Sequence, residues 1–125
     1  MPGDAALDLL AREGLTLSPG QRAAVPTGVA IALPPGYAGF VQPRSGRALH
    51  EGLGVANSPG LIDSGYRGEI KVIAVNLDTE APVQVKRGEK IAQLVVQRVE
   101  SVQLEVTDRL PPSDRGEGGL GSTGR

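Results

Sequence analysis

Two short stretches of this chain combine residue types that could bind phosphate and activate water. Arg44, Ser45 and Gly46 offer a guanidinium, a hydroxyl and backbone N–H groups, which all donate hydrogen bonds to phosphate. Asp63 lies in the turn SPGLIDSGY, whose glycines and proline can hold a carboxylate rigidly enough to serve as a general base. By residue type alone, the same positions are also compatible with an ordinary strand-to-helix turn and an aspartate that caps its own turn.

A third stretch, GEGGLG at residues 116–121, has the glycine spacing of a dinucleotide-binding loop. That motif needs a strand before it, a helix after it and an acidic residue about 20 positions further on. Here Pro111 and Pro112 precede the glycines, and four residues follow Gly121. A Walker-type G-x-x-x-x-G-K-[ST] loop is also absent from the sequence. The stretch is therefore predicted to be a tail or arm and not a Rossmann loop.

The elements that must position these residues are predicted to be short strands. The chain holds 18 glycines and 10 prolines, so turns are frequent and long helices are not expected. With two tyrosines and one phenylalanine, the core must be built from Val, Ile and Leu, which favour strands. Such a core is thin for a monomer, so burial between subunits is expected.

Apolar runs of strand length occupy residues 28–34, 38–43, 69–77, 82–88 and 90–99. Many short strands separated by turns predict an all-β sandwich, barrel or jelly roll. The stretch from Ala48 to Glu51 favours one short helix, which Ser45 caps or begins.

Charge and composition argue against several classes of function. A net charge of -1 and a pI near 5.8 give no basis for binding nucleic acid or an anionic membrane surface. Without cysteine there is no disulfide, and the single histidine, His50, does not make a zinc site. No run approaches the roughly 20 apolar residues of a membrane span, and the start is acidic where a signal peptide is basic. A cytoplasmic protein is expected.

Five stretches together resemble the trimeric dUTP pyrophosphatase (dUTPase) family, in the family's order and at about its spacing. They are GDAALDL, PRSGRALHEG, GVANSPGLIDSGYRGEIKV, RGEKIAQLVV and RGEGGLGSTG. The resemblance implies a jelly-roll subunit of the β-clip type over residues 1–110. It also implies a flexible Gly-rich arm over residues 111–125, which closes the active site of a neighbouring subunit in a homotrimer. The implied reaction is the Mg²⁺-assisted hydrolysis of dUTP to dUMP and pyrophosphate, which keeps uracil out of DNA and supplies dUMP for thymidylate synthesis.

The same resemblance assigns roles to individual residues. Asp63 matches the aspartate that orients and activates the attacking water, and Asp8 matches one that reaches the magnesium ion through coordinated water. The implied phosphate contacts are Arg44, Ser45, Gly46, Gln93, Arg115, Gly118, Gly119, Ser122 and Thr123. The implied uracil and deoxyribose contacts are Asn57, Gly60, Leu61, Ile62, Tyr66, Lys71 and Leu120.

Several alternatives stay open on the sequence. Tyr66 could be a core residue and Lys71 a solvated strand charge, while His50 is expected to lie on the helix surface. Leu120 stands where many members of the family have a phenylalanine that stacks on uracil, so closure of the arm is expected to be weaker. A dCTP deaminase, which resembles the same fold, needs a catalytic glutamate where this chain has Ile73. The other alternative is a non-catalytic jelly roll that binds a nucleotide.

Overall fold

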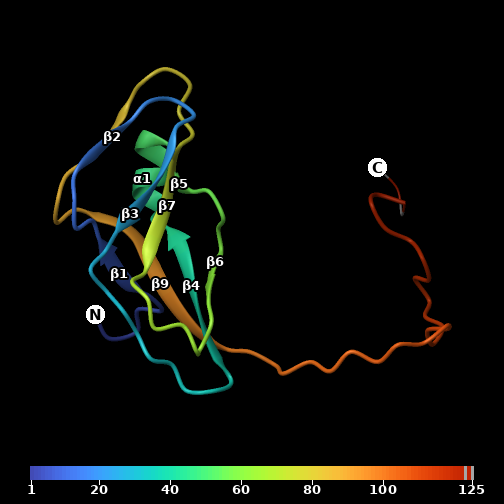
Figure 1. The fold of residues 1–125 in the computed structure, drawn as a ribbon. Helices are drawn as coiled ribbons and strands as arrows, with labels where there is room; N and C mark the ends of the chain where they lie inside the picture. Colours follow the sequence, from blue (N-terminus) through green and yellow to red (C-terminus); the bar gives the residue numbers. More distant parts are fainter. Residues whose placement is uncertain (123, 125) are drawn as a thin grey trace.

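The computed structural model describes residues 1–122 and 124, and the body of the molecule is made of short antiparallel strands (Figure 1). Its elements in chain order are β1 (Leu7–Leu10), β2 (Leu15–Leu17), β3 (Arg22–Pro26), β4 (Tyr37–Pro43), α1 (Ser45–Glu51), β5 (Leu53–Val55), β6 (Gly60–Ile62), β7 (Lys71–Asn76), β8 (Val83–Val85) and β9 (Lys90–Arg98).

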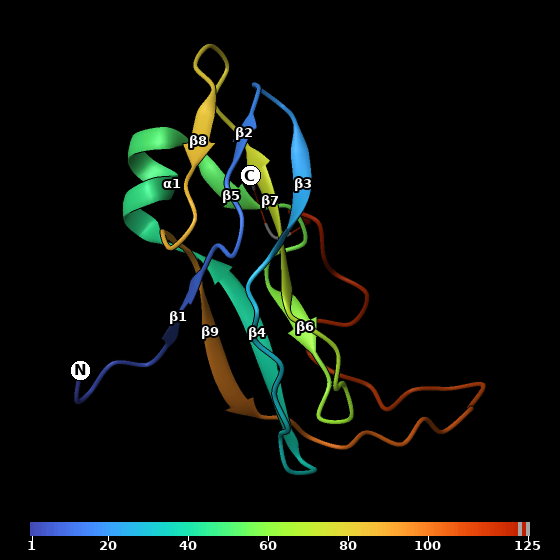
Figure 2. The same cartoon turned by 60° about the vertical axis from the view of Figure 1, so that its left-hand side comes forward.

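The strands form three antiparallel sheets, with the orders β1-β9-β4-β6, β3-β7-β5 and β2-β8. In Figure 2 the four-stranded sheet fills the lower part of the body, and α1 lies beside the upper end of β4. The subunit is a jelly roll with one short helix, which confirms the predicted fold class.

The core is aliphatic and takes side chains from all three sheets, as the composition predicted. Its fully buried members include Leu17 of β2, Val72 of β7 and Ile91 of β9. Burying one such side chain stabilises the fold by roughly 1.5–3 kcal/mol. Tyr37 and Phe40 are only partly buried, and Tyr66 is exposed. The three aromatic residues therefore lie outside the buried core.

The predicted strand over residues 28–34 is wrong, because this stretch has no sheet partner. One backbone bond, from Ile70 N–H to the Val29 carbonyl, holds it against the segment before β7. The helix is longer than expected and begins at Ser45, with Arg44 as its N-cap and no side-chain capping bond. Ser45 thus begins the helix and does not cap it. Gly52 ends the helix with φ 75°, where a Cβ would lie 2.7 Å from the Asp78 backbone nitrogen.

Asn76 fastens the end of β7 to two other segments. Its side chain is 1% exposed; Nδ2 donates to the carbonyls of Leu17 (3.0 Å) and Ala81 (2.9 Å), and Oδ1 accepts from the Asp78 N–H (2.8 Å). Asn76→Ala would leave these buried groups without partners, so we expect the free energy of unfolding to fall by about 2–3 kcal/mol. Urea unfolding at fixed protein concentration measures this change. Gln97→Ala, at an exposed position of β9, is the control, and a loss no larger than the control's would contradict the role of Asn76.

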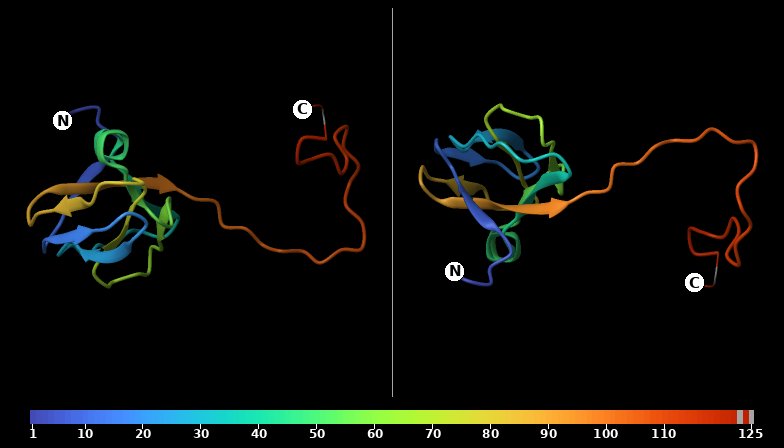
Figure 3. Two further views of the ribbon diagram at one scale, coloured as in Figure 1. Left: turned by 90° about the horizontal axis from the view of Figure 1, so that it is seen from above. Right: turned by 90° about the horizontal axis from the view of Figure 1, so that it is seen from below.

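After β9 the chain leaves the body as an extended arm. Figure 3 shows it from above and below, running away from the sheets before it turns back at its end. The described residues beyond Arg98 form no helix or strand, and Leu104 and Val106 are almost fully exposed. The domain boundary after residue 110 stays a prediction, as does the flexibility of residues 111–125. Among the described residues, no helix is both long and apolar enough to cross a membrane.

Candidate active site

Four of the nine predicted phosphate-binding residues line one hollow at the end of β4. This hollow has a volume of about 330 Å³, and its walls include Arg44, Ser45, Gly46 and Gln93. β4 ends at Pro43 and so delivers Arg44 to the rim, while β9 places Gln93 opposite the last residues of β4. The Gln93 side chain donates to the Pro43 carbonyl at 3.2 Å, which fixes it at the strand end. We call this hollow the phosphate cavity.

Asp8 joins the same cluster from the neighbouring strand. In the β1–β9 register it lies opposite Gln93, and it lines an adjoining hollow of about 400 Å³ together with Arg44 and Gln93. Its carboxylate lies 3.5 Å from Arg44 Nε and 3.3 Å from Lys90 Nζ. The sheet therefore brings together a carboxylate and two cations that are far apart in the sequence.

Asp8 fits a magnesium ion that is held mainly by a substrate. Among the described residues, no group of three or more Asp, Glu or His side chains could hold a metal ion by itself. Magnesium prefers carboxylate and phosphate oxygen and keeps several of its waters. One exposed carboxylate beside the phosphate cavity can supply one such contact, and the other ligands must come from phosphate and water.

The predicted general base and most of the base- and sugar-reading residues form a second cluster. Its hollow of about 440 Å³ is lined by Leu61, Ile62, Asp63, Tyr66, Glu69, Ile70, Lys71, Ile73 and Ala24. Asp63 is exposed, in the turn that follows β6. Asn57 lies in the turn before β6 and Gly60 begins β6, where a Cβ on Gly60 would meet the Asn57 amide at 3.2 Å. We call this hollow the hairpin cavity.

Tyr66 is a surface residue held in a defined orientation. Its side chain is 43% exposed, so it is not part of the core. The hydroxyl donates to the Glu69 carbonyl at 2.8 Å, and the ring lies directly over Gly68. A Cβ on Gly68 would come within 2.5 Å of the Tyr66 hydroxyl oxygen. Gly68 is therefore the residue that allows the ring to lie flat against the backbone.

The two cavities lie at opposite ends of β4. In the antiparallel β4–β6 pair Ile62 lies opposite Gly39, so Asp63 comes level with Ala38, beside which it lines a further hollow. Arg44 lies six residues further along the chain, or about 20 Å at 3.3 Å per residue. Figure 2 shows β6 running away from the α1 end of β4. A general base must lie within hydrogen-bond distance of the attacking water, and a guanidinium must lie within hydrogen-bond distance of the phosphate that the water attacks. One chain therefore does not bring Asp63 and Arg44 to the same phosphate.

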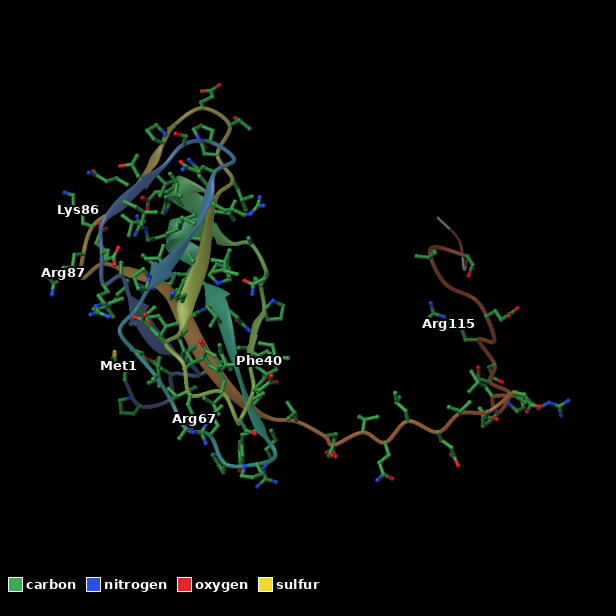
Figure 4. The ribbon with its side chains drawn as sticks, in the orientation of Figure 1. Met1, Phe40, Arg67, Lys86, Arg87 and Arg115 are labelled. Atoms are coloured by element: carbon green, nitrogen blue, oxygen red, sulfur yellow. The ribbon has the colours of Figure 1, made fainter. Side chains whose placement is uncertain are left out.

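The arm carries the remaining predicted contacts away from both cavities. Figure 4 shows Arg115 on the arm, well separated from the body. Its Nε donates to the Gly118 carbonyl at 2.6 Å, within the arm itself. Gly119, Leu120 and Ser122 follow on the same segment, and Leu120 is fully exposed with φ 51°. Thr123 lies outside the described residues.

Arg47 lines the phosphate cavity and Lys90 forms an ion pair with Asp8 beside it, but neither residue was assigned a role from the sequence. Lys90 precedes Gln93 by three residues on β9. That spacing alone does not indicate that Lys90 lies near Asp8, which only the pairing of β9 with β1 shows. Arg47 and Glu51 have the i, i+4 spacing of a helical ion pair, which the sequence did show. Their hydrogen bonds hold the pKa of the Glu51 carboxyl below its usual value and raise the pKa of Arg47. His50 is exposed on α1, as expected.

Comparison with known proteins agrees with the five motifs. The family model described as dUTPase matches residues 1–124. The deoxyuridine 5'-triphosphate nucleotidohydrolase of Streptomyces griseus is 58% identical over 123 residues, which cover 98% of this chain and 70% of that protein. The enzyme of the same name from Thermobifida fusca is 57% identical, with 98% and 69% covered.

Solved structures agree at lower identity. The dUTPase of Staphylococcus bacteriophage 80alpha with dUpNHpp superposes with a TM-score of 0.91 at 27% identity, covering 100% of this chain and 89% of that one. A mutant dUTPase from phage phi11 of S. aureus, described with a structural Mg(II) ion, has a TM-score of 0.80 at 25% identity, with 89% and 88% covered. By the match of the family model over nearly its whole length, and by relatives more than half identical, this chain belongs to the dUTPase family.

Proposed function

We propose that this dUTPase hydrolyses dUTP to dUMP and pyrophosphate by attack of an Asp63-activated water on the α-phosphate. Asp63 accepts a proton from the water, whose oxygen forms a new bond to the α-phosphorus. The bond from that phosphorus to the α–β bridging oxygen breaks, and pyrophosphate leaves with the electron pair. The observation that carries this proposal is the exposed Asp63 carboxylate in the wall of the cavity that Tyr66 also lines.

The phosphate cavity would bind the triphosphate. The Arg44 guanidinium donates charged hydrogen bonds, and the Ser45 hydroxyl and the N–H groups of Ser45 and Gly46 at the start of α1 add neutral ones. Gly46 has open space where a Cβ would lie, so phosphate oxygens can approach its backbone closely. Gln93 adds an amide donor from β9.

Asp8 would hold the magnesium ion through water. The ion would supply positive charge that stabilises the negative charge of the phosphates. Asp8 is now paired with Arg44 and Lys90, so these two cations become free to face phosphate when the carboxylate turns to the ion's water ligands.

The hairpin cavity would select the base and the sugar. Asn57 and the backbone groups from Gly60 to Ile62 read the edges of uracil, and cytosine is rejected because its donors would face donors. Tyr66 packs under the deoxyribose, where its ring blocks a 2′-hydroxyl. Lys71 lies on the same wall, near the nucleotide.

A complete site would form between chains of a homotrimer. The separation of Asp63 and Arg44 along β4 supports this assembly, because one subunit can offer its hairpin cavity to the phosphate cavity of another. The extended arm of a further subunit would then cover the triphosphate. There Arg115 meets the γ-phosphate, and the backbone of Gly118 and Gly119 closes over it together with Ser122 and Thr123. Leu120 would cover the uracil ring without stacking on it.

Gly68→Ala tests the role of Tyr66. The new methyl group would push the Tyr66 ring off the backbone, so we expect the preference for dUTP over UTP to fall by roughly tenfold. The ratio of kcat/KM for the two nucleotides measures this preference. Gly65→Ala is the matched control, since nothing lies within 4 Å of its Cβ position. Equal changes in both variants would show that the Tyr66 ring does not read the sugar.

The whole proposal is tested by incubating the protein with Mg²⁺ and, separately, with dUTP, dCTP, dTTP and UTP. Pyrophosphate and dUMP from dUTP alone are expected. Ammonia and dUTP from dCTP would support the deaminase alternative, although Ile73 offers no carboxylate in the hairpin cavity. Bound but unchanged dUTP would indicate a non-catalytic module. Pyrophosphate release in the absence of Mg²⁺ tests whether the reaction needs the metal ion. The cytoplasmic location stays a prediction.

A further inference from the structure

Arg47 is a charged residue of α1 that is mostly hidden from solvent. Its side chain is 15% exposed, although the helix has no fully buried residue. The guanidinium binds Glu51 with two parallel hydrogen bonds, from Nε to Oε2 at 2.8 Å and from Nη2 to Oε1 at 2.9 Å. This fork-to-fork geometry needs the planar guanidinium, which lysine cannot reproduce.

The same guanidinium connects α1 to the turn that leads into β9. Nη2 also donates to the Gln84 carbonyl of β8 at 3.0 Å, and Nη1 lies 3.6 Å from Glu89 Oε2. Glu89 is itself held, because its Oε1 accepts from the Lys86 N–H at 2.6 Å. Arg47 thus fixes the helix that begins with Ser45 against the strand that carries Gln93.

The charges around Arg47 bear directly on an anionic ligand. Arg47 and Glu51 both line the phosphate cavity. Without the guanidinium, the negative charge of Glu51 would not be neutralised and would repel a bound triphosphate. The Glu89 carboxylate, which lies 3.6 Å from Arg47 Nη1, would add to this repulsion. Nη1 is buried and donates no hydrogen bond to the described residues. A buried donor without a partner destabilises the fold, so stability alone does not explain why a guanidinium is present at this position.

We infer that Arg47 is a positioning residue for the triphosphate: it neutralises Glu51 in the wall of the phosphate cavity and locks Ser45 and Gln93 into one binding surface. This role rests on the proposed function of the phosphate cavity. Arg47 lines the wall of the phosphate cavity, and we assign it no contact with the reacting phosphorus or the attacking water. Arg47 therefore sets how tightly the triphosphate binds and leaves the chemical step nearly unchanged.

The test compares Arg47→Leu with the double variant Arg47→Leu/Glu51→Leu. In the single variant we expect KM for dUTP, and Kd for the non-hydrolysable α,β-imido-dUTP, to rise about tenfold. We expect kcat to change by less than about threefold. The double variant replaces the ion pair by two apolar side chains at i, i+4 and removes the repelling carboxylate. Its KM and Kd should fall at least about threefold below those of Arg47→Leu but stay above the wild-type values, because the contacts of Arg47 with Gln84 and Glu89 are still missing.

Two further variants separate this role from a loss of fold. Arg47→Lys keeps the charge without the fork and should give a KM between those of the wild type and Arg47→Leu. Asn76→Ala, which disturbs buried hydrogen bonds away from the cavity, should lower stability without raising KM. If Arg47→Leu does not fold, Arg47→Lys and the double variant carry the test.

The inference is overturned if the double variant binds no better than Arg47→Leu, if lysine is no better than leucine, or if kcat falls while Kd is unchanged. A wild-type protein that does not hydrolyse dUTP would instead contradict the proposed function. The Kd for α,β-imido-dUTP would still decide the role of Arg47 in that case.

Discussion

Asp63→Asn is expected to lower kcat for dUTP by roughly 10³-fold, with the Kd for α,β-imido-dUTP changed by less than about threefold. Removing a positioned general base typically costs 10²–10⁴ in rate, and asparagine keeps the shape of the side chain without its ability to take a proton. Asp63 is exposed and lies after β6, outside the core, so the substitution should not disturb the fold. Steady-state release of pyrophosphate gives kcat, and calorimetric titration gives Kd.

The matched control for this variant is Asp108→Asn, which changes another exposed aspartate that lines neither the phosphate cavity nor the hairpin cavity. It should retain nearly full turnover. Turnover by Asp63→Asn within tenfold of the wild type would show that another group takes the proton. A matching loss of kcat and of nucleotide binding would show that Asp63 serves binding and not proton transfer.

Co-expression of Asp63→Asn with Arg44→Ala is expected to restore activity that neither variant has alone. Each chain carries one intact cavity, and a site is complete when the hairpin cavity of an Arg44→Ala chain meets the phosphate cavity of an Asp63→Asn chain. With random mixing in equal amounts, about a quarter of the interfaces have this composition. The unseparated mixture should therefore show about a quarter of the wild-type activity per chain, and the purified hybrid trimers about a third, because each mixed ring of three has one such interface.

Two different affinity tags on the chains allow the hybrids to be purified away from the parent trimers. The control places both substitutions in one chain and co-expresses it with wild-type chains. About a quarter of the interfaces then join two wild-type chains and keep an intact site. Absence of any recovery in the opposite-variant hybrids, with the trimer confirmed by light scattering, would mean that Asp63 and Arg44 of the same chain serve one site. The separation of about 20 Å along β4 argues against that result.

The family was predictable from the sequence because its resemblance is carried by residue types in five short motifs. PRSG and the turn around Asp63 each lie within a few residues, so their phosphate-binding and proton-accepting capacities are visible without a fold. The longer strands were also predictable, since β7 and β9 are rich in β-branched residues. Strands of three or four residues, such as β2 and β5, are too short to show a period, and they form because distant partners pair with them.

By itself, then, the sequence determined the all-β class, the aliphatic core and the kinds of groups available for binding phosphate and activating water. Only the tertiary structure decided which of those groups meet. The β1–β9–β4 register brings Asp8, Gln93 and Arg44 together, and the β4–β6 register carries Asp63 to the far end of the same sheet. Likewise, the i, i+4 spacing of Arg47 and Glu51 was readable, but their contact with the β8–β9 turn was not. The physical reason is that strand pairing joins residues far apart in the chain, so its register depends on the partner strand and the shared core as well as on the local pattern.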